Sequence, residues 1–173
     1  MTLLRAPLVL ALGALLLGAC GYGVREEAGM RFSEPGVVMD LRPFGNQSLF
    51  PDGGAFLAGR LREELVRDGF RGRFARSNPD YVVEGTVREV REEVISHSAD
   101  QFALEYRLTL HVDVRVVEVT HGRLLWKEEG LAESASYFSS ADFQYTESNR
   151  RMAFEETCRR MARRIGQTLR VIL

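Results

Sequence analysis

Cysteine and histidine are scarce in this sequence, and both shortages limit what the chain can be. Its 173 residues contain two cysteines, Cys20 and Cys158, so a scaffold held by several disulfides is excluded. The three histidines, His97, His111 and His121, have no metal-ligand spacing to one another or to a cysteine pair. We therefore expect no metal site and no cofactor.

Catalytic signatures are also missing. There is no Gly-x-Ser-x-Gly elbow, no glycine-rich phosphate loop and no His-Glu-x-x-His sequence. The adjacent carboxylates Glu92 and Glu93, like Glu128 and Glu129, fall on opposite faces of a strand and cannot act together as acid and base. The sequence therefore predicts a protein that is not an enzyme.

An excess of either charge is lacking too. Lys and Arg number 23 against 24 Asp and Glu, which gives a net charge of −1. If residues 1–19 are removed, Arg5 is lost, and the remaining 22 basic and 24 acidic residues give a net charge of −2. This balance argues against a general nucleic-acid-binding protein.

Only one long apolar run is present, and it lies at the N-terminus. It follows Arg5 and extends from Leu8 to Leu17, about the length of a signal-peptide core, whereas a membrane-spanning helix needs about twenty residues. Segment 17–20, Leu-Gly-Ala-Cys, has the pattern of a lipoprotein cleavage site. We therefore expect residues 1–19 to be a signal peptide. A plain secretory signal with a chance cysteine is the alternative.

Cleavage there makes Cys20 the first residue, carrying S-diacylglycerol and N-acyl groups. Each buried acyl CH₂ contributes about 0.8 kcal/mol, so two or three chains would anchor the protein permanently. With Cys20 lipidated, Cys158 has no disulfide partner. Cys158 lies on the apolar side of a helical pattern, which favours core packing over reactivity.

The mature chain divides into a leader, residues 20–36, and one α+β domain, residues 37–173. Residues 37–41 have the pattern of a short strand. A first helix is expected between Asp52 as N-cap and Gly69 as the terminating glycine. Its apolar stripe is Phe56, Leu57, Leu61 and Leu65, and the residues expected to face water are Arg60, Arg62, Glu63 and Glu64.

Three long strands are expected next, forming an antiparallel meander. The first begins at Tyr81 and slips its apolar phase before Val90, which indicates a bulge. The second, 102–117, alternates apolar and polar residues throughout. A turn at 121–123 leads to the third strand, which reaches Tyr137 with a kink or bulge at Gly130.

A long C-terminal helix is expected from about Thr146 to the end. Its apolar stripe is Phe154, Cys158, Met161, Ile165, Leu169 and Ile172. The resulting fold class is a two-layer α+β sandwich, with a mostly antiparallel four-stranded sheet covered on one face by two helices.

The same helix carries an arginine cluster, Arg159, Arg160, Arg163 and Arg164. Arginine suits phosphate because its planar guanidinium forms paired hydrogen bonds, so these residues are candidate phosphate contacts. The alternative, which we favour, is that they only solvate the outer side of the helix.

The order of these parts resembles the LPS-assembly lipoproteins called LptE. The resemblance covers nearly the whole chain and is carried by features in a fixed order: Cys20-Gly21-Tyr22, the strand before Asn46, a helix, Gly85, Glu105-Tyr106-Arg107, Gly122, Leu125-Trp126, Tyr137 and the C-terminal helix. It implies a non-catalytic outer-membrane lipoprotein on the periplasmic face. Such a protein plugs the β-barrel LptD, helps it to fold and binds lipopolysaccharide on its way to the outer leaflet.

Members of the family contact lipopolysaccharide through basic residues at two positions, and this sequence has basic residues near only one of them. The turn that holds basic residues in the family reads His97-Ser98-Ala99-Asp100-Gln101 here, without Lys or Arg. Arg150 and Arg151 lie near the second family position. Other outer-membrane lipoproteins of similar fold, such as activators of peptidoglycan synthases or secretion-channel subunits, stay open as the alternative, because they share the lipidation signal and a loop like Phe44-Gly45-Asn46.

Overall fold

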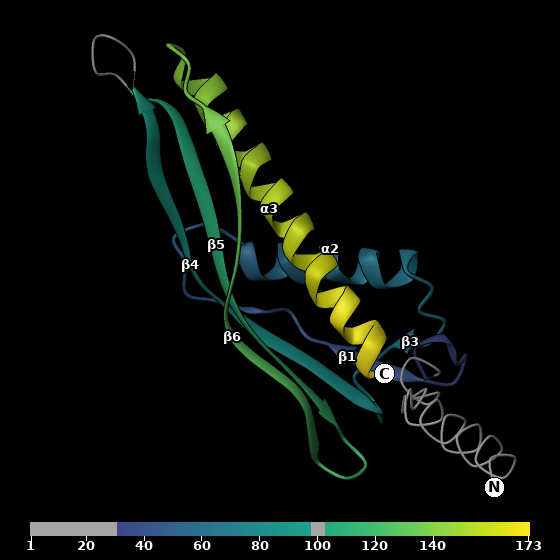
Figure 1. Cartoon of the computed structure of the whole chain (residues 1–173). Coiled ribbons are helices and arrows are strands. Elements are labelled where there is room, and N and C mark those ends of the chain that lie inside the picture. The colour runs from purple at the N-terminus through teal and green to yellow at the C-terminus, as the bar shows by residue number, and fades with distance from the viewer. Residues whose placement is uncertain (1–30, 98–102) are drawn as a thin grey trace, which may run out of the picture.

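The computed structural model describes residues 31–97 and 103–173, shown in Figure 1. The predicted signal peptide, Cys20, most of the leader, the turn 98–101 and Phe102 lie outside these ranges. The elements are a 3-10 turn η1 (Arg31–Ser33), β1 (Val38–Leu41), β2 (Gly45–Asn46), α2 (Gly53–Arg67), β3 (Arg73–Phe74), β4 (Tyr81–His97), β5 (Ala103–Glu118), β6 (Arg123–Phe138) and α3 (Phe143–Ile172). No helix in the described ranges is long and apolar enough to cross a membrane.

The sheet is mixed and has six strands, in the order β3-β1-β4-β5-β6, with β2 also paired to β4. The α+β class is confirmed, but the four-stranded, mostly antiparallel sheet is wrong in detail. β1 pairs in parallel with both β3 and β4, and β2 pairs in parallel with β4. The chain passes from β1 through α2 before it returns as β4, which makes these two strands parallel. β2 and β3 have two residues each, too few to show a periodic pattern.

The predicted meander of β4, β5 and β6 is confirmed. β4 and β5 pair antiparallel, with a register shift between Val87 and Glu89, where the apolar phase slips. β5 and β6 pair antiparallel, with a second shift between Val112 and Val114. Gly130 lies opposite that shift with φ of 70°, a backbone conformation that glycine adopts without strain.

One face of the sheet carries the core, and both helices contribute to it. From β5 the buried side chains are the even-numbered residues from Leu108 to Val116, which are at most 2% exposed. From the helices they are Leu57, Leu61 and Leu65 of α2 and Phe154, Cys158, Met161, Ile165 and Leu169 of α3. The stripe expected in each helix therefore faces the sheet.

Two details of the helix starts differ from expectation. Asp52 does precede α2, but it has a left-handed φ of 55° and its side chain makes no capping hydrogen bond. α3 begins three residues earlier than expected, because Asp142 accepts a hydrogen bond of 2.8 Å from the backbone N–H of Gln144.

α2 approaches the β1–β2 connection so closely that a side chain could not fit between them. A Cβ on Gly54 would lie 2.0 Å from the carbonyl oxygen of Phe44. Glycine at this position thus lets the first turn of α2 rest on the backbone that precedes β2.

Glu64 is the one residue of α2 whose exposure was predicted wrongly. It is 5% exposed. α3 crosses α2 at this point, so Glu64 lies between Arg67, at 2.6 Å, and Arg163 of α3, at 3.7 Å. A helical wheel of α2 alone places Glu64 toward water because it contains no information about α3.

The chain enters and leaves the domain at the same end. The backbone N–H of Arg31 donates to the carbonyl oxygen of Leu173 at 3.1 Å, and the neighbouring Phe32 is 1% exposed. α3 runs from there to the opposite end of the molecule (Figure 1). Its 30 residues correspond to about 45 Å.

Candidate functional site

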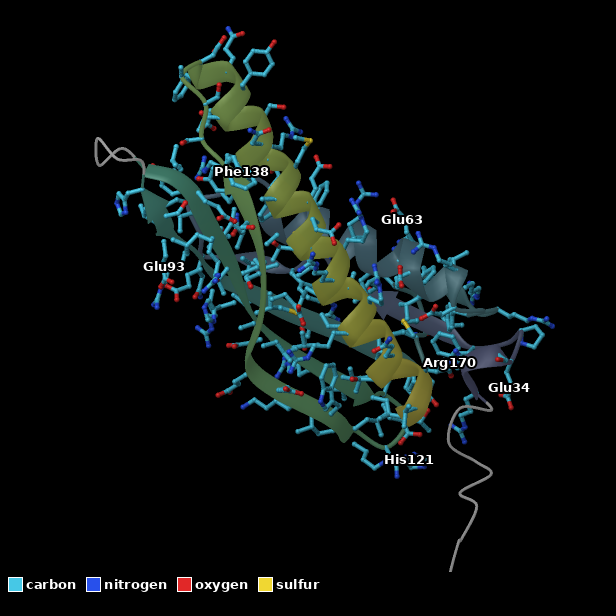
Figure 2. All side chains as sticks on the ribbon, turned by 45° about the horizontal axis from the view of Figure 1, so that its top comes forward. Glu34, Glu63, Glu93, His121, Phe138 and Arg170 are labelled. Carbon is cyan, nitrogen blue, oxygen red and sulfur yellow. The ribbon has the colours of Figure 1, made fainter. Side chains whose placement is uncertain are left out.

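The end of the molecule farthest from Arg31 and Leu173, here called the tip, exposes several large apolar side chains. The end of β4, the start of β5, the end of β6 and the first turns of α3 form it, and Figure 2 labels Phe138 near this end with Glu34 and Arg170 at the other. Phe143, Tyr145 and Phe138 are 75%, 66% and 63% exposed. The remaining members are Val94, Ile95, Leu104 and Met152.

A concentration of exposed apolar side chains at one end marks a contact surface, for another protein or for lipid. No pattern in the sequence indicates this surface. Each residue is unremarkable in its own element, and only the antiparallel pairing of β4, β5 and β6 brings their ends to the start of α3.

An ion-pair network beside the tip joins α3 to the sheet. Arg150 donates from Nε to Glu92 at 2.8 Å, and the hydroxyl of Tyr137 donates to the other carboxylate oxygen of Glu92. Arg150 also lies 3.4 Å from Glu147 and stacks over the ring of Phe50 at 5.0 Å. The network thereby links β4, β6, α3 and the loop before α2.

The network shifts the pKa of each of its three central groups. Partial burial raises the pKa of Glu92, but the hydrogen bonds from Arg150 and Tyr137 outweigh it, so the pKa lies below its ordinary 4.5. Burial and the neighbouring Glu92 carboxylate raise the pKa of Tyr137. The hydrogen bond to Glu92 raises the pKa of Arg150. Glu92 is therefore a carboxylate at neutral pH, bound by two donors.

Two clefts adjoin this region. One of about 740 Å³ lies between the loop before α2 and α3, lined by Phe50, Phe56, Arg150, Arg151 and Phe154 among others. Phe50 and Phe154 stack there with ring centroids 3.9 Å apart. A second cleft of about 610 Å³ follows β6 from Ser134 to Phe138 and faces α3.

The arginines singled out in α3 do not form one patch. Arg159 pairs with Glu156 at 2.6 Å, and Arg163 faces Glu64 of α2 at 3.7 Å. Arg160 and Arg164 reach toward β6. Arg160 lies 2.9 Å from Glu156, and Arg164 lies 3.5 Å from both Glu128 and Glu133. Each guanidinium is about half exposed and has a carboxylate partner within the domain.

Of the two arginines near the family's second contact position, Arg151 is the more accessible. Its side chain is 78% exposed and has one distant partner, Glu155 at 3.5 Å. Arg150 is 33% exposed and is already bound by Glu92 and Glu147.

Cys158 is fully buried, as its place in the apolar stripe predicted. Burial raises the pKa of its thiol to about 12, so it is protonated at neutral pH and unreactive. Within residues 31–97 and 103–173, no group of three His, Cys, Asp or Glu side chains could hold a metal ion.

Comparison with known proteins gives a family and a fold. The family model for lipopolysaccharide assembly, LptE, matches residues 38–169, which is well over half of the chain. No curated protein matches the chain.

Solved structures, two of them of lipoproteins, share the fold at low identity. Rare lipoprotein B from Shewanella oneidensis has a TM-score of 0.57 and 15% identity, over 76% of this chain and 92% of that one. A minor lipoprotein from Acinetobacter baumannii has a TM-score of 0.56 and 16% identity, over 77% and 90%. The PelC dodecamer from Paraburkholderia phytofirmans has a TM-score of 0.50 and 16% identity, over 81% and 92%.

Proposed function

Because the chain belongs to the LptE lipopolysaccharide-assembly family, we propose that it is an outer-membrane lipoprotein that plugs an LptD-type β-barrel and assists its assembly. Members of this family are assembly lipoproteins and not enzymes. The role is therefore one of binding and shape: the domain occupies the barrel and contacts lipopolysaccharide on its way to the outer leaflet. The family match over residues 38–169 is the observation that carries this proposal.

The placement of the chain ends supports an anchor at one end and a contact surface at the other. The chain enters the domain beside Leu173, so lipid on Cys20 would hold that end near the periplasmic face of the outer membrane. A body about 45 Å long then carries the tip away from the anchor. This geometry suits a plug that extends into a barrel.

The tip also has the chemistry expected of a surface that meets acyl chains or the apolar segments of a partner. Its aromatic and aliphatic side chains are exposed, and Arg151 lies on the same part of α3 with a largely free guanidinium. Arg159, Arg160, Arg163 and Arg164 stay candidate phosphate contacts. A phosphate would have to displace the carboxylate that each of them already faces.

The proposal is tested by affinity purification of the tagged full-length chain from membranes of a Gram-negative host in mild detergent. We expect an LptD-type barrel, identified by mass spectrometry, to copurify with the wild type. Phe143→Ser with Tyr145→Ser should reduce its recovery. Val119→Ser with Val171→Ser, exposed apolar residues outside the tip, is the matched control. Absence of the barrel from the wild-type eluate would contradict the proposed function.

The likeness to the PelC dodecamer favours one competing role, that of a subunit in an oligomer of identical copies. At 16% identity the likeness shows the fold alone. Native mass spectrometry of the detergent-solubilised chain separates the two roles. A complex of one chain with one barrel supports the plug, and an oligomer of many copies without a barrel supports the competing role.

A further inference from the structure

β6 is the edge strand of the sheet, so one side of its backbone has no neighbouring strand among residues 31–97 and 103–173. In an antiparallel strand, alternate residues direct both N–H and C=O away from the paired neighbour. An exposed row of such groups is a template on which another chain can add a strand. The length of β6, 16 residues, makes this edge a large one.

α3 places side-chain donors along this edge. Arg160 donates to the carbonyl oxygen of Ser134 at 2.9 Å, and Arg164 approaches that of Ala132 at 3.4 Å. Asn149 donates from its side-chain amide to the carbonyl oxygen of Phe138 at 2.9 Å. The three acceptor residues are all even-numbered in β6, so their carbonyls lie on the same side of the strand, the side that faces away from β5.

The two arginines are themselves held in position. Glu156 binds Arg160 from the preceding turn of α3, and Glu128 and Glu133 flank Arg164 from β6. Among the described residues, Arg159 and Arg163 contact no carbonyl of β6: Arg159 shares Glu156 with Arg160, and Arg163 faces Glu64 of α2. The four arginines therefore differ in one respect, because only Arg160 and Arg164 reach the backbone of β6.

We propose that Asn149, Arg160 and Arg164 close the outer edge of β6 against strand addition by a second copy of this chain. The donors occupy the carbonyls that an incoming strand needs, and the positively charged side chains lie where its backbone would run. Removing them uncovers a continuous row of carbonyls from Ala132 to Phe138, beside the cleft of about 610 Å³ that Asn149 and Arg160 line together with this part of β6.

The experiment uses the full-length chain in detergent, with Ser136→Cys as a reporter on the exposed edge. Cys158 is fully buried, and a lipidated Cys20 has no free thiol, so a short bis-maleimide reagent reports on residue 136. Each background without Ser136→Cys is the blank that detects any cross-linking through Cys20. Three backgrounds are compared: wild type, Arg160→Gln with Arg164→Gln, and Arg159→Gln with Arg163→Gln. The two double variants remove the same charge from the same helix.

We expect a several-fold rise in cross-linked dimer for the Arg160/Arg164 variant, and no rise for the Arg159/Arg163 variant. Hydrogen exchange of the backbone amides at 134 and 136 should also slow with protein concentration in the first variant alone. Equal cross-linking in both double variants would overturn the proposal. If circular dichroism shows that the Arg160/Arg164 double variant is unfolded, the single variants Arg160→Gln and Arg159→Gln are compared, and equal yields there overturn it as well.

Discussion

Two glycines of α2 should respond in opposite directions to the same substitution. Gly59 is exposed in the helix interior, and a Cβ there would meet nothing within 4 Å. Gly59→Ala should therefore increase the free energy of unfolding by about 0.5 to 1 kcal/mol, through the higher helix propensity of alanine. A Cβ on Gly54 would lie 2.0 Å from the oxygen and 2.8 Å from the carbon of the Phe44 carbonyl.

Neither of these backbone atoms can move without displacing the chain before β2 or the start of α2. Overpacking of this kind costs roughly 1 to 3 kcal/mol, and we expect Gly54→Ala at the upper end because backbone and not a flexible side chain must yield. The two variants should then differ by about 2 kcal/mol or more.

The assay is urea unfolding followed by circular dichroism, on a soluble form that lacks residues 1–20. Both variants replace one glycine of α2 by alanine, so a difference between their free energies of unfolding reflects the position alone. If Gly54→Ala is as stable as Gly59→Ala, α2 does not rest on the Phe44 backbone as described.

Further expectations concern the core, the network beside the tip and the anchor. Leu110 is fully buried, so Leu110→Ala should cost about 2 to 5 kcal/mol, while Thr109→Ser should cost little; equal shifts in unfolding midpoint would contradict the register of β5. Because the folded pKa of Glu92 is depressed, its contribution to stability is present above its ordinary pKa of 4.5 and is lost as pH falls below that value. Glu92→Gln should therefore weaken the acid-induced loss of stability, and an unchanged dependence on pH in thermal melts would contradict this. Cys20→Ser should leave an unlipidated precursor, and mass spectrometry of the mature N-terminus that finds any other first residue would contradict the predicted anchor.

Family membership and most of the long elements could be predicted from the sequence, because the information is local and repeated. β5 alternates apolar and polar residues through most of its length, and the stripe from Phe154 to Leu169 recurs at helical spacing, so each pattern has one structural solution. Gly69, Gly122 and Gly130 mark the helix end, the turn and the bulge, and all three have positive φ. The lipidation signal at Cys20 is likewise local, and it stays a prediction.

Other features of the fold and of the site depended on how the elements pack against one another. β2 and β3 are too short to have a period, and the parallel pairing of β1 depends on where α2 returns the chain. Glu64 is buried because α3 crosses above it, and Glu92 is held by residues 45 and 58 positions away in sequence. The arginines of α3 form one cluster in sequence, but the packed helix directs Arg163 toward α2 and both Arg160 and Arg164 toward the edge of β6. Helical periodicity determines which side chains share a face, whereas only packing determines which carboxylates and carbonyls that face meets.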